Sequence, residues 1–183
     1  MTEFMLNRAY LSLGSNVEPE FNLVEAARML AAKTKLVVAS SVWETTPLGS
    51  TRQPNYLNAA AIVDTELTVV QLKHDLIAEI ERGLGRVRQL DKFAPRPIDI
   101  DIMLFNHQIF TLDKRQIPDP EVLERSFVAI PLAEIAPDYI HPETGQTLQQ
   151  IARGFQPKET DMWLRPDLSQ SLQQLSSLQF KKV

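Results

Sequence analysis

The stretch at residues 98–105, Ile-Asp-Ile-Asp-Ile-Met-Leu-Phe, restricts the fold most strongly because apolar and acidic side chains alternate along it. This alternation predicts a β-strand whose isoleucines point into a core. Asp99 and Asp101 then leave the opposite face, roughly 7 Å apart along the strand. The chain is therefore expected to build a sheet that carries a carboxylate pair on one face.

The elements expected before this strand give the order β-α-β-β-α-β. Strands are predicted at 9–13, 36–43 and 58–65, and helices at 20–32 and 68–84. Thr68 and Gln71 have the spacing of a capping box at the start of the second helix. Gly85 is a natural stop at the end of that helix. This order is typical of an α+β fold of the ferredoxin-like type, a split β-α-β antiparallel sheet with helices packed on it.

Beyond the strand the pattern is weaker. A helical pattern covers 121–135 and is expected to be interrupted at Pro131, and a short helix is expected at 147–152. From Arg153 onward the composition shifts toward Gln and Ser, with leucines at rough helical spacing. This tail is expected either to dock as a helix or to stay loose.

Composition excludes several classes of protein. The 183 residues suit one domain, and the absence of cysteine excludes disulfides, thiolate nucleophiles and thiolate metal sites. A net charge of −4 disfavours general nucleic-acid binding. No apolar run approaches ~18 residues, and the first ten residues do not resemble a signal peptide. We expect a cytoplasmic monomer that contacts neither membranes nor nucleic acid.

A basic loop precedes the carboxylate pair. Four cationic residues fall between Gly85 and Pro97, namely Arg86, Arg88, Lys92 and Arg96. Paired carboxylates suit Mg²⁺, and guanidinium groups suit phosphate oxygens, so the combination favours a Mg²⁺–polyphosphate site. The alternative is a solvated loop beside two solvated aspartates. No Walker-type or kinase glycine-rich loop is present.

Three other residues could bind a flat polar ring. Tyr56 and Asn58 are two apart on a predicted strand and can share one face, and Phe127 could supply a second aromatic surface. An aromatic face stacks on a heterocycle while an amide reads its polar edge. Each residue alone would more often belong to the core or to a turn.

Together these segments resemble the 6-hydroxymethyl-7,8-dihydropterin pyrophosphokinase family of folate biosynthesis. The resemblance runs from Tyr10 to about Ala152, and its most specific part is Lys92-Phe-Ala-Pro-Arg96-Pro-Ile-Asp99-Ile-Asp101-Ile-Met103. The other matching segments are Gly14-Ser15-Asn16, Thr45-Thr46-Pro47-Leu48-Gly49, Gln53-Pro54-Asn55-Tyr56-Leu57-Asn58, Gly85-Arg86-Val87-Arg88 and Arg125-Ser126-Phe127.

The resemblance implies an ATP-dependent diphosphokinase with its catalytic domain at residues 8–152 and a C-terminal tail, helical or disordered, at 153–183. ATP would donate its β,γ-pyrophosphoryl group to the pterin hydroxymethyl oxygen, releasing AMP. Asp99 and Asp101 would bind two Mg²⁺ ions. Arg86 and Arg96 would contact the transferring group, and these four residues are the expected catalytic set.

The resemblance also assigns the two substrate pockets. The pterin would stack between Tyr56 and Phe127, with its edge read by Asn58 and by groups around Thr45, Pro47 and Leu48. The nucleotide contacts would include Glu81, Arg86, Arg88, Lys114 and Arg125. The chain departs from the family at Asp119, where a histidine is frequent, at Lys114 in place of an arginine, and at Phe93 in place of a tryptophan.

Three alternatives remain open at this point. A non-catalytic pterin- or nucleotide-binding module of the same fold would bind ligand without turnover. A Mg²⁺-dependent nucleotide phosphohydrolase would need a water-directed base and no flat-ring pocket. A structural partner of other folate enzymes would use the extra tail.

Overall fold

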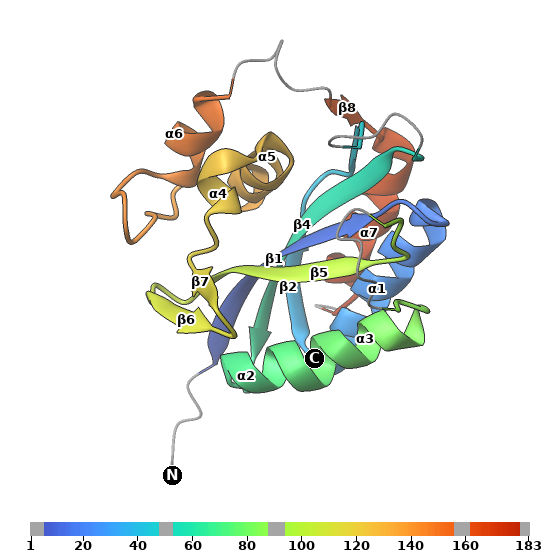
Figure 1. The fold of residues 1–183 in the computed structure, drawn as a ribbon, viewed down its shortest axis with the longest axis horizontal. Coiled ribbons are helices and arrows are strands. Elements are labelled where there is room, and N and C mark those ends of the chain that lie inside the picture. The colour runs from blue at the N-terminus through green and yellow to red at the C-terminus, as the bar shows by residue number, and fades with distance from the viewer. Residues whose placement is uncertain (1–5, 48–52, 88–93, 156–161, 180–183) are drawn as a thin grey trace.

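The computed structural model describes residues 6–47, 53–87, 94–155 and 162–179 (Figure 1). Its main sheet has the strand order β5-β1-β4-β3-β8, with β2 also paired to β4. The strands of this sheet are β1 (Asn7–Ser15), β2 (Lys35–Ala39), β3 (Trp43–Thr45), β4 (Tyr56–Thr65), β5 (Asp99–Phe105) and β8 (Met162–Leu164). A separate hairpin consists of β6 (Phe110–Leu112) and β7 (Arg115–Ile117).

The predicted α+β arrangement is confirmed. Every pairing in the main sheet is antiparallel, and β1 lies between β4 and β5 as the ferredoxin-like order requires. The predicted strand at 36–43 is wrong as a single element, because it divides into β2 and β3. At the division, Ser40 replaces a regular pairing, since its N–H donates to Ala60 O at 2.9 Å and its hydroxyl accepts from Ala60 N–H at 2.8 Å.

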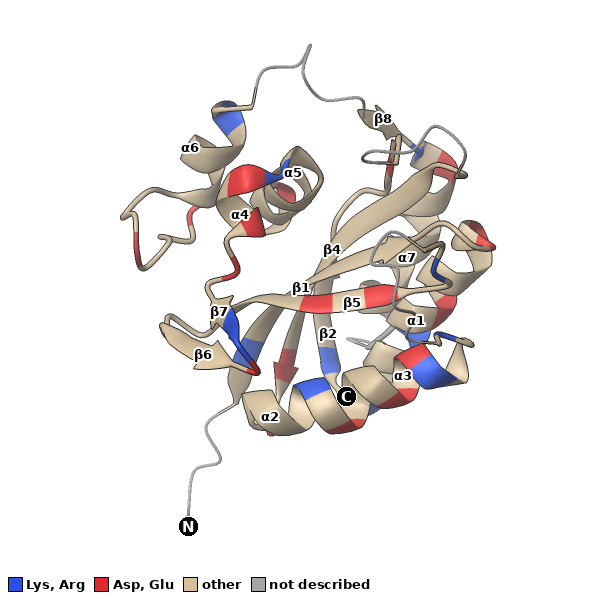
Figure 2. Ribbon diagram, in the orientation of Figure 1, with Lys and Arg blue, Asp and Glu red and all other residues tan. Residues whose placement is uncertain are grey.

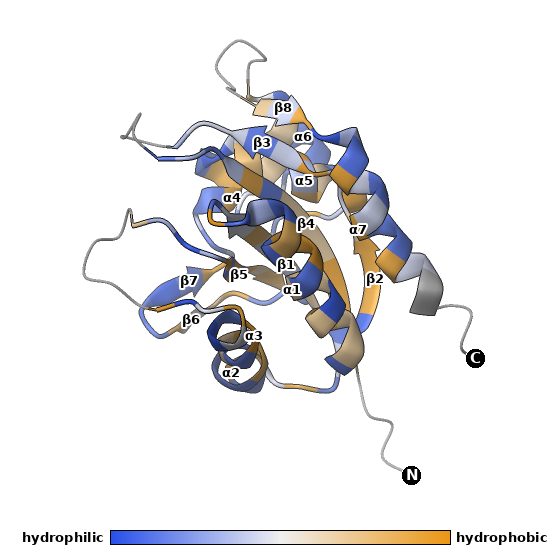
Figure 3. Cartoon of the chain, turned by 90° about the vertical axis from the view of Figure 1, so that its right-hand side faces the viewer, coloured by the Kyte–Doolittle hydropathy of each residue, from blue (hydrophilic) through white to orange (hydrophobic). Residues whose placement is uncertain are grey.

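Helices cover both faces of the sheet (Figure 1), and in Figure 3 their apolar residues turn largely inward. The first group is α1 (Pro19–Lys33), the continuous helix α2 (Val69–Gln71), η1 (Leu72–Ile77) and α3 (Ala78–Gly83), and α7 (Pro166–Gln179). The second group is α4 (Glu121–Glu124), α5 (Ser126–Ile135) and α6 (Leu148–Arg153). Each group covers one hydrophobic core, which we call the first and the second core. Alternate residues of β1 follow this division, because Leu11 packs in the first core and Tyr10 in the second.

Two helix predictions have different outcomes. The capping box of Thr68 and Gln71 is confirmed, with both reciprocal hydrogen bonds formed. The expected interruption at Pro131 is wrong, because the chain breaks at Arg125, where φ is −125° and ψ is 118°, and Pro131 lies inside α5. Burial of Pro131 with its neighbour Leu132 offsets the backbone hydrogen bond that a proline cannot make.

The C-terminal residues of the described chain pack on the sheet. Strand β8 pairs with β3, and α7 contacts β2 and α1, with Leu172 only 1% exposed. In the ranges that the structure describes, no helix combines the length and apolar character needed to cross a membrane.

The first core should be sensitive to truncation at α1. Leu30 is fully buried there, so Leu30→Ala should lower the free energy of unfolding by about 2–5 kcal/mol through lost burial and a residual cavity. Phe21 lies on the same helix and is 62% exposed, so Phe21→Ala should change the free energy of unfolding by less than about 1 kcal/mol. Urea unfolding measures both values, and equal losses would contradict this packing.

Candidate active site

The carboxylate pair lies on the face of β5 opposite the first core. Ile98, Ile100 and Ile102 are buried in that core, and Asp99 and Asp101 are partly exposed on the other side. Figure 2 shows acidic residues along β5. The register then builds a row across the sheet, because Gly14 of β1 is paired with Asp99 on one side and with Asn58 of β4 on the other.

Two arginines bind Asp99 from the two ends of the basic loop. Arg86 follows α3 and Arg96 precedes β5, and each contacts a different carboxylate oxygen of Asp99. Burial acts to raise the pKa of Asp99, but the two guanidinium groups hold it below its ordinary value. The structure thus brings three of the predicted catalytic residues together, namely Arg86, Arg96 and Asp99.

Glu81 supports Arg86 from beneath. Its side chain is 7% exposed, contacts the Arg86 guanidinium and accepts the Ile100 N–H at 3.0 Å. Burial raises the pKa of Glu81, and the Ile100 N–H and Arg86 act against that shift. Glu81 thus ties α3 to β5 and contacts Arg86, and the nucleotide contact expected from the sequence stays a prediction.

Asp101 has its own pair of cations, which the sequence analysis missed. Lys73 Nζ lies 3.1 Å from Asp101 Oδ1 and donates to Ile100 O at 3.2 Å. Arg115 also contacts Asp101 Oδ1 and lies 3.3 Å from Asp119. The helical spacing at 72–84 predicted the helix that carries Lys73, but not that its π-helical segment η1 lies against β5.

A tight turn decides which residue of the β6–β7 hairpin reaches Asp101. Asp113 and Lys114 both have positive φ, 50° and 72°, so they form the turn and Arg115 begins β7. Lys114, the residue expected to contact ATP, therefore lies at the tip next to Arg115. The pair Asp-Lys is not a usual signal for such a turn, which is why the sequence did not single out Arg115.

Asp119 and Arg125 lie further along, between the hairpin and α5. Asp119 is 3% exposed and accepts the Glu121 N–H at 3.0 Å. Burial raises the pKa of Asp119, against the lowering effect of that N–H and of Arg115. Arg125 lies where α4 gives way to α5, and its buried Nε has no hydrogen-bond partner within the described ranges.

The residues expected to bind the flat ring lie at the Asn58 end of the row. Asn58 and Thr45 are 5% and 7% exposed, and Asn58 Nδ2 donates to Thr45 Oγ1 at 2.9 Å. A Cβ at Gly14 would lie 3.4 Å from Asn58 Oδ1, so the glycine keeps the space between this amide and Asp99 open. Burial raises the pKa of the partly buried Tyr56, and Arg96 opposes the shift.

For the other residues expected in the pterin pocket, the structure gives their place in the fold. Phe127 lies on α5, partly buried against the second core, and Pro47 follows β3. Leu48 and Arg88, predicted to contact pterin and ATP, fall outside the described residues, as does Phe93.

Asn16 joins the two halves of the site, a role that the sequence gave no reason to assign. It is 1% exposed, its Oδ1 accepts the Arg96 N–H at 2.8 Å, and its Nδ2 donates to Gln53 Oε1 at 3.2 Å. One side chain thus connects the loop before β5 with the loop before β4.

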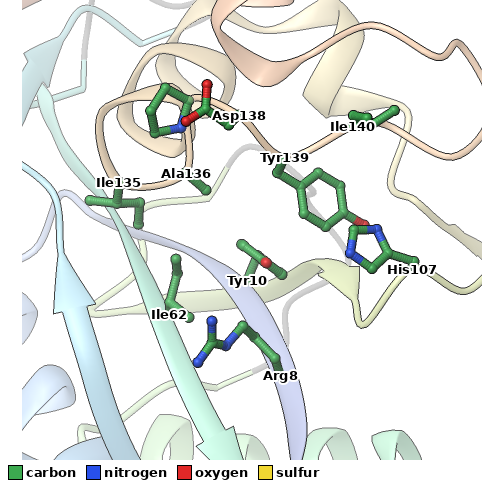
Figure 4. A pocket seen from close by; sticks show the side chains of 10 residues that line it. Arg8, Tyr10, Ile62, His107, Ile135, Ala136, Asp138, Tyr139 and Ile140 are labelled. Carbon is green, nitrogen blue, oxygen red and sulfur yellow. The ribbon is translucent and has the colours of Figure 1, made fainter.

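A cavity of about 460 Å³ lies elsewhere, between β1, β4 and the segment after α5 (Figure 4). Arg8, Tyr10 and Ile62 line it, with Tyr139 stacked on His107 at 4.6 Å between ring centroids. Arg8 is six residues from Gly14 on β1, roughly 20 Å along the strand. This cavity is therefore separate from the carboxylate site.

Comparison with known families identifies the family to which the chain belongs. Residues 10–137 match the family described as 7,8-dihydro-6-hydroxymethylpterin-pyrophosphokinase. The chain belongs to this pyrophosphokinase family. The resemblance found in the sequence is confirmed, and family membership makes the chain an ATP-dependent diphosphokinase, a transferase.

Curated relatives agree with this assignment. The chain is 37% identical over 150 residues to a 2-amino-4-hydroxy-6-hydroxymethyldihydropteridine pyrophosphokinase of Pseudomonas aeruginosa, covering 80% of the chain and 91% of the relative. It is 40% identical over 141 residues to a folic acid synthesis protein of Pneumocystis carinii, covering 76% of the chain but only 19% of that protein.

Among structures, the HPPK-DHPS protein of Plasmodium falciparum with pterin and p-hydroxybenzoate superposes with a TM-score of 0.65 at 15% identity, covering 82% of this chain and 42% of that one. At this identity the likeness concerns the fold. The chain corresponds to less than half of that larger protein.

The arginine pair on Asp99 predicts a specific acid dependence of stability. A carboxyl whose pKa is lowered by folding adds stability that is fully present above its unfolded pKa, about 4, and lost as the pH falls through the folded pKa. Between about pH 5 and pH 2.5, the free energy of unfolding should therefore fall more steeply for the unaltered protein than for Asp99→Asn. Urea unfolding at a series of pH values measures this, and parallel pH curves would contradict it.

Proposed function

We propose that this chain transfers the β,γ-pyrophosphoryl group of ATP to the hydroxymethyl oxygen of 6-hydroxymethyl-7,8-dihydropterin, giving AMP and the pterin diphosphate of folate biosynthesis. The observation that carries the proposal is the row Asp99–Gly14–Asn58, which sets a cation-bound carboxylate and a buried amide on one sheet face. These two groups are roughly 10 Å apart across β1, where Gly14 contributes no side chain of its own. A ring bound at the amide end would direct its substituent toward the carboxylate.

The donor set fits Mg²⁺, of which we propose two ions. Asp99 and Asp101 offer oxygen ligands on one face of β5, and no third His, Cys, Asp or Glu joins them as a metal cluster in the described parts of the chain. Mg²⁺ commonly takes one or two carboxylates and completes its shell with water and substrate phosphates. Bound there, Mg²⁺ would neutralise phosphate charge. Four cationic side chains already contact Asp99 or Asp101, so these two carboxylates attract positive charge.

The residues of this chain act mainly by positioning and charge. Arg86 and Arg96 would donate to the oxygens of the transferring group, since phosphoryl-type transfer has a loose transition state that charge neutralisation favours. The hydroxymethyl oxygen forms a bond to the β-phosphorus, and the bond from that phosphorus to the α,β-bridging oxygen breaks, leaving with AMP. The hydroxyl proton passes to Asp99 or Asp101.

Substrate recognition divides between the two ends of the row. We assign the pterin to Tyr56, Asn58 and Phe127, with Thr45, Pro47 and Leu48 at its edge, and the nucleotide to Arg88, Lys114 and Arg125. The buried Nε of Arg125 has no hydrogen-bond partner among the described residues, which supports the nucleotide assignment because a ligand oxygen would satisfy it. Glu81 contributes by holding Arg86. We further propose that residues 8–152 form the catalytic domain and that the protein acts as a cytoplasmic monomer.

The reaction is tested by incubating the protein with ATP and Mg²⁺, with and without the pterin, and measuring AMP against ADP. We expect pterin-dependent AMP and a pterin diphosphate. Asp99→Asn and Asp101→Asn should each lower the rate by at least about a hundredfold, because each removes a ligand and charge that the transition state needs. Asp75→Asn, an exposed position on η1, is the matched control and should keep the rate.

The alternatives give other products. ADP and phosphate formed independently of pterin would indicate a phosphohydrolase, and pterin binding without turnover would indicate a binding module. Either result would overturn the proposed transfer.

The pterin pocket is tested separately at Asn58. Asn58→Ala should raise KM for the pterin by about tenfold, the effect of losing one or two buried hydrogen bonds. KM for ATP should stay within about twofold, since the nucleotide is assigned to the other end of the row. Steady-state kinetics with each substrate varied in turn measures both. Equal changes in the two constants would place Asn58 outside a pterin-specific pocket.

A further inference from the structure

The C-terminal segment beyond the family match holds the edge strand next to the proposed pterin pocket. The family match ends at residue 137, whereas β8 and α7 lie at 162–164 and 166–179. β8 pairs with β3 along its whole length, from Trp43↔Leu164 to Thr45↔Met162. β3 is therefore held between β4 and a strand that the family core does not include.

Arg165, the residue between β8 and α7, fixes the start of β3 through the backbone. Its N–H donates to Val42 O at 2.9 Å, and its carbonyl accepts from Ser169 Oγ at 2.7 Å. Ser169 Oγ in turn accepts the Val42 N–H at 2.8 Å. Both polar groups of Val42, a fully buried residue, are thus satisfied by the tail.

The Arg165 side chain continues toward the pocket through Glu44 of β3. Arg165 Nη1 donates to Glu44 Oε2 at 2.9 Å, and the other oxygen of Glu44 accepts Asn55 Nδ2, also at 2.9 Å. The Asn55 amide and Arg165 keep the pKa of Glu44 below its ordinary value, so the relay remains ionised near neutral pH. Asn55 directly precedes Tyr56, which pairs with Thr45 in the β3–β4 register.

We propose that Arg165 is a positioning residue for the pterin pocket, which acts through Glu44 to set β3 and the Asn55–Asn58 segment in register. The proposal rests on the pterin pocket assigned under the proposed function. Consecutive strand residues point to opposite faces, so Glu44 receives Arg165 on the side of β3 opposite to Thr45. Arg165 thus acts on the pocket from the opposite side of β3, where it has no contact with substrate.

Arg165 also pairs with Glu20 of α1, at 2.8 Å from Nη2, and this second carboxylate provides the matched control. Glu44→Gln and Glu20→Gln each remove one charged partner of Arg165, but only Glu44 connects to the pocket. The experiment measures KM for pterin, KM for ATP and kcat for these variants and for Arg165→Gln, Arg165→Lys and the double variant Arg165→Gln/Glu44→Gln. Thermal unfolding of each variant is recorded in parallel.

Arg165→Gln and Glu44→Gln should each raise KM for pterin by about tenfold and leave KM for ATP within about twofold. The double variant should match the single ones, because both break one relay, and Arg165→Lys should restore part of the loss. Glu20→Gln should keep the original KM for pterin.

Equal effects of Glu20→Gln and Glu44→Gln would overturn the proposal, since Arg165 would then act only by anchoring the tail. Additive effects in the double variant, or KM changes that follow thermal stability for both substrates, would overturn it as well. If the unaltered protein makes no pterin-dependent AMP, the proposed function itself is contradicted. That measurement on the unaltered protein separates a failure of the proposed function from a failure of the Arg165 proposal.

Discussion

The first part of strand β5, residues 99–101, is buried on one face and charged on the other, and much of the structure follows from this requirement. Its isoleucines need helices from the first group to cover them, and its aspartates need cations from several parts of the chain. Partly buried carboxylates are costly without partners, and removing one member of such a pair leaves the other uncompensated. The neighbouring elements are arranged so that η1, the end of α3, the loop before β5 and β7 each bring one cation.

This arrangement also explains how an acidic protein can carry the polyanion site proposed above. The net charge of −4 describes the whole chain, whereas the cations on Asp99 and Asp101 are local. Oligophosphates and Mg²⁺ carry opposite charges, so a site that contains both carboxylates and guanidinium groups can accept both. Within the protein these opposite charges also pair with one another, through Arg86 and Arg96 on Asp99 and through Lys73 and Arg115 on Asp101.

The sequence predicted what depends on local pattern and missed what depends on distant contacts. The alternation of residues 98–105 and the capping box of Thr68 are short-range signals, and both were correct. The division of 36–43 into two strands depends on Ser40 meeting Ala60, which no local pattern reveals. Family resemblance supplied the catalytic candidates. It gave no role to Lys73, Arg115 or Asn16, whose positions come from a π-helical segment, an unusual turn and a contact between residues 80 positions apart.

Strand β4 meets two different partners in succession along one edge, β3 near its start and β2 further on. Tyr56 and Asn58 near its start belong to the proposed pterin pocket, and its later residues, from Ala59 to Val63, fill the two cores. Substitutions at Thr45, Tyr56 and Asn58 can change the proposed pocket while the core residues from Ala59 to Val63 stay unchanged. The fold thus separates the part of the strand that can evolve from the part that must be preserved.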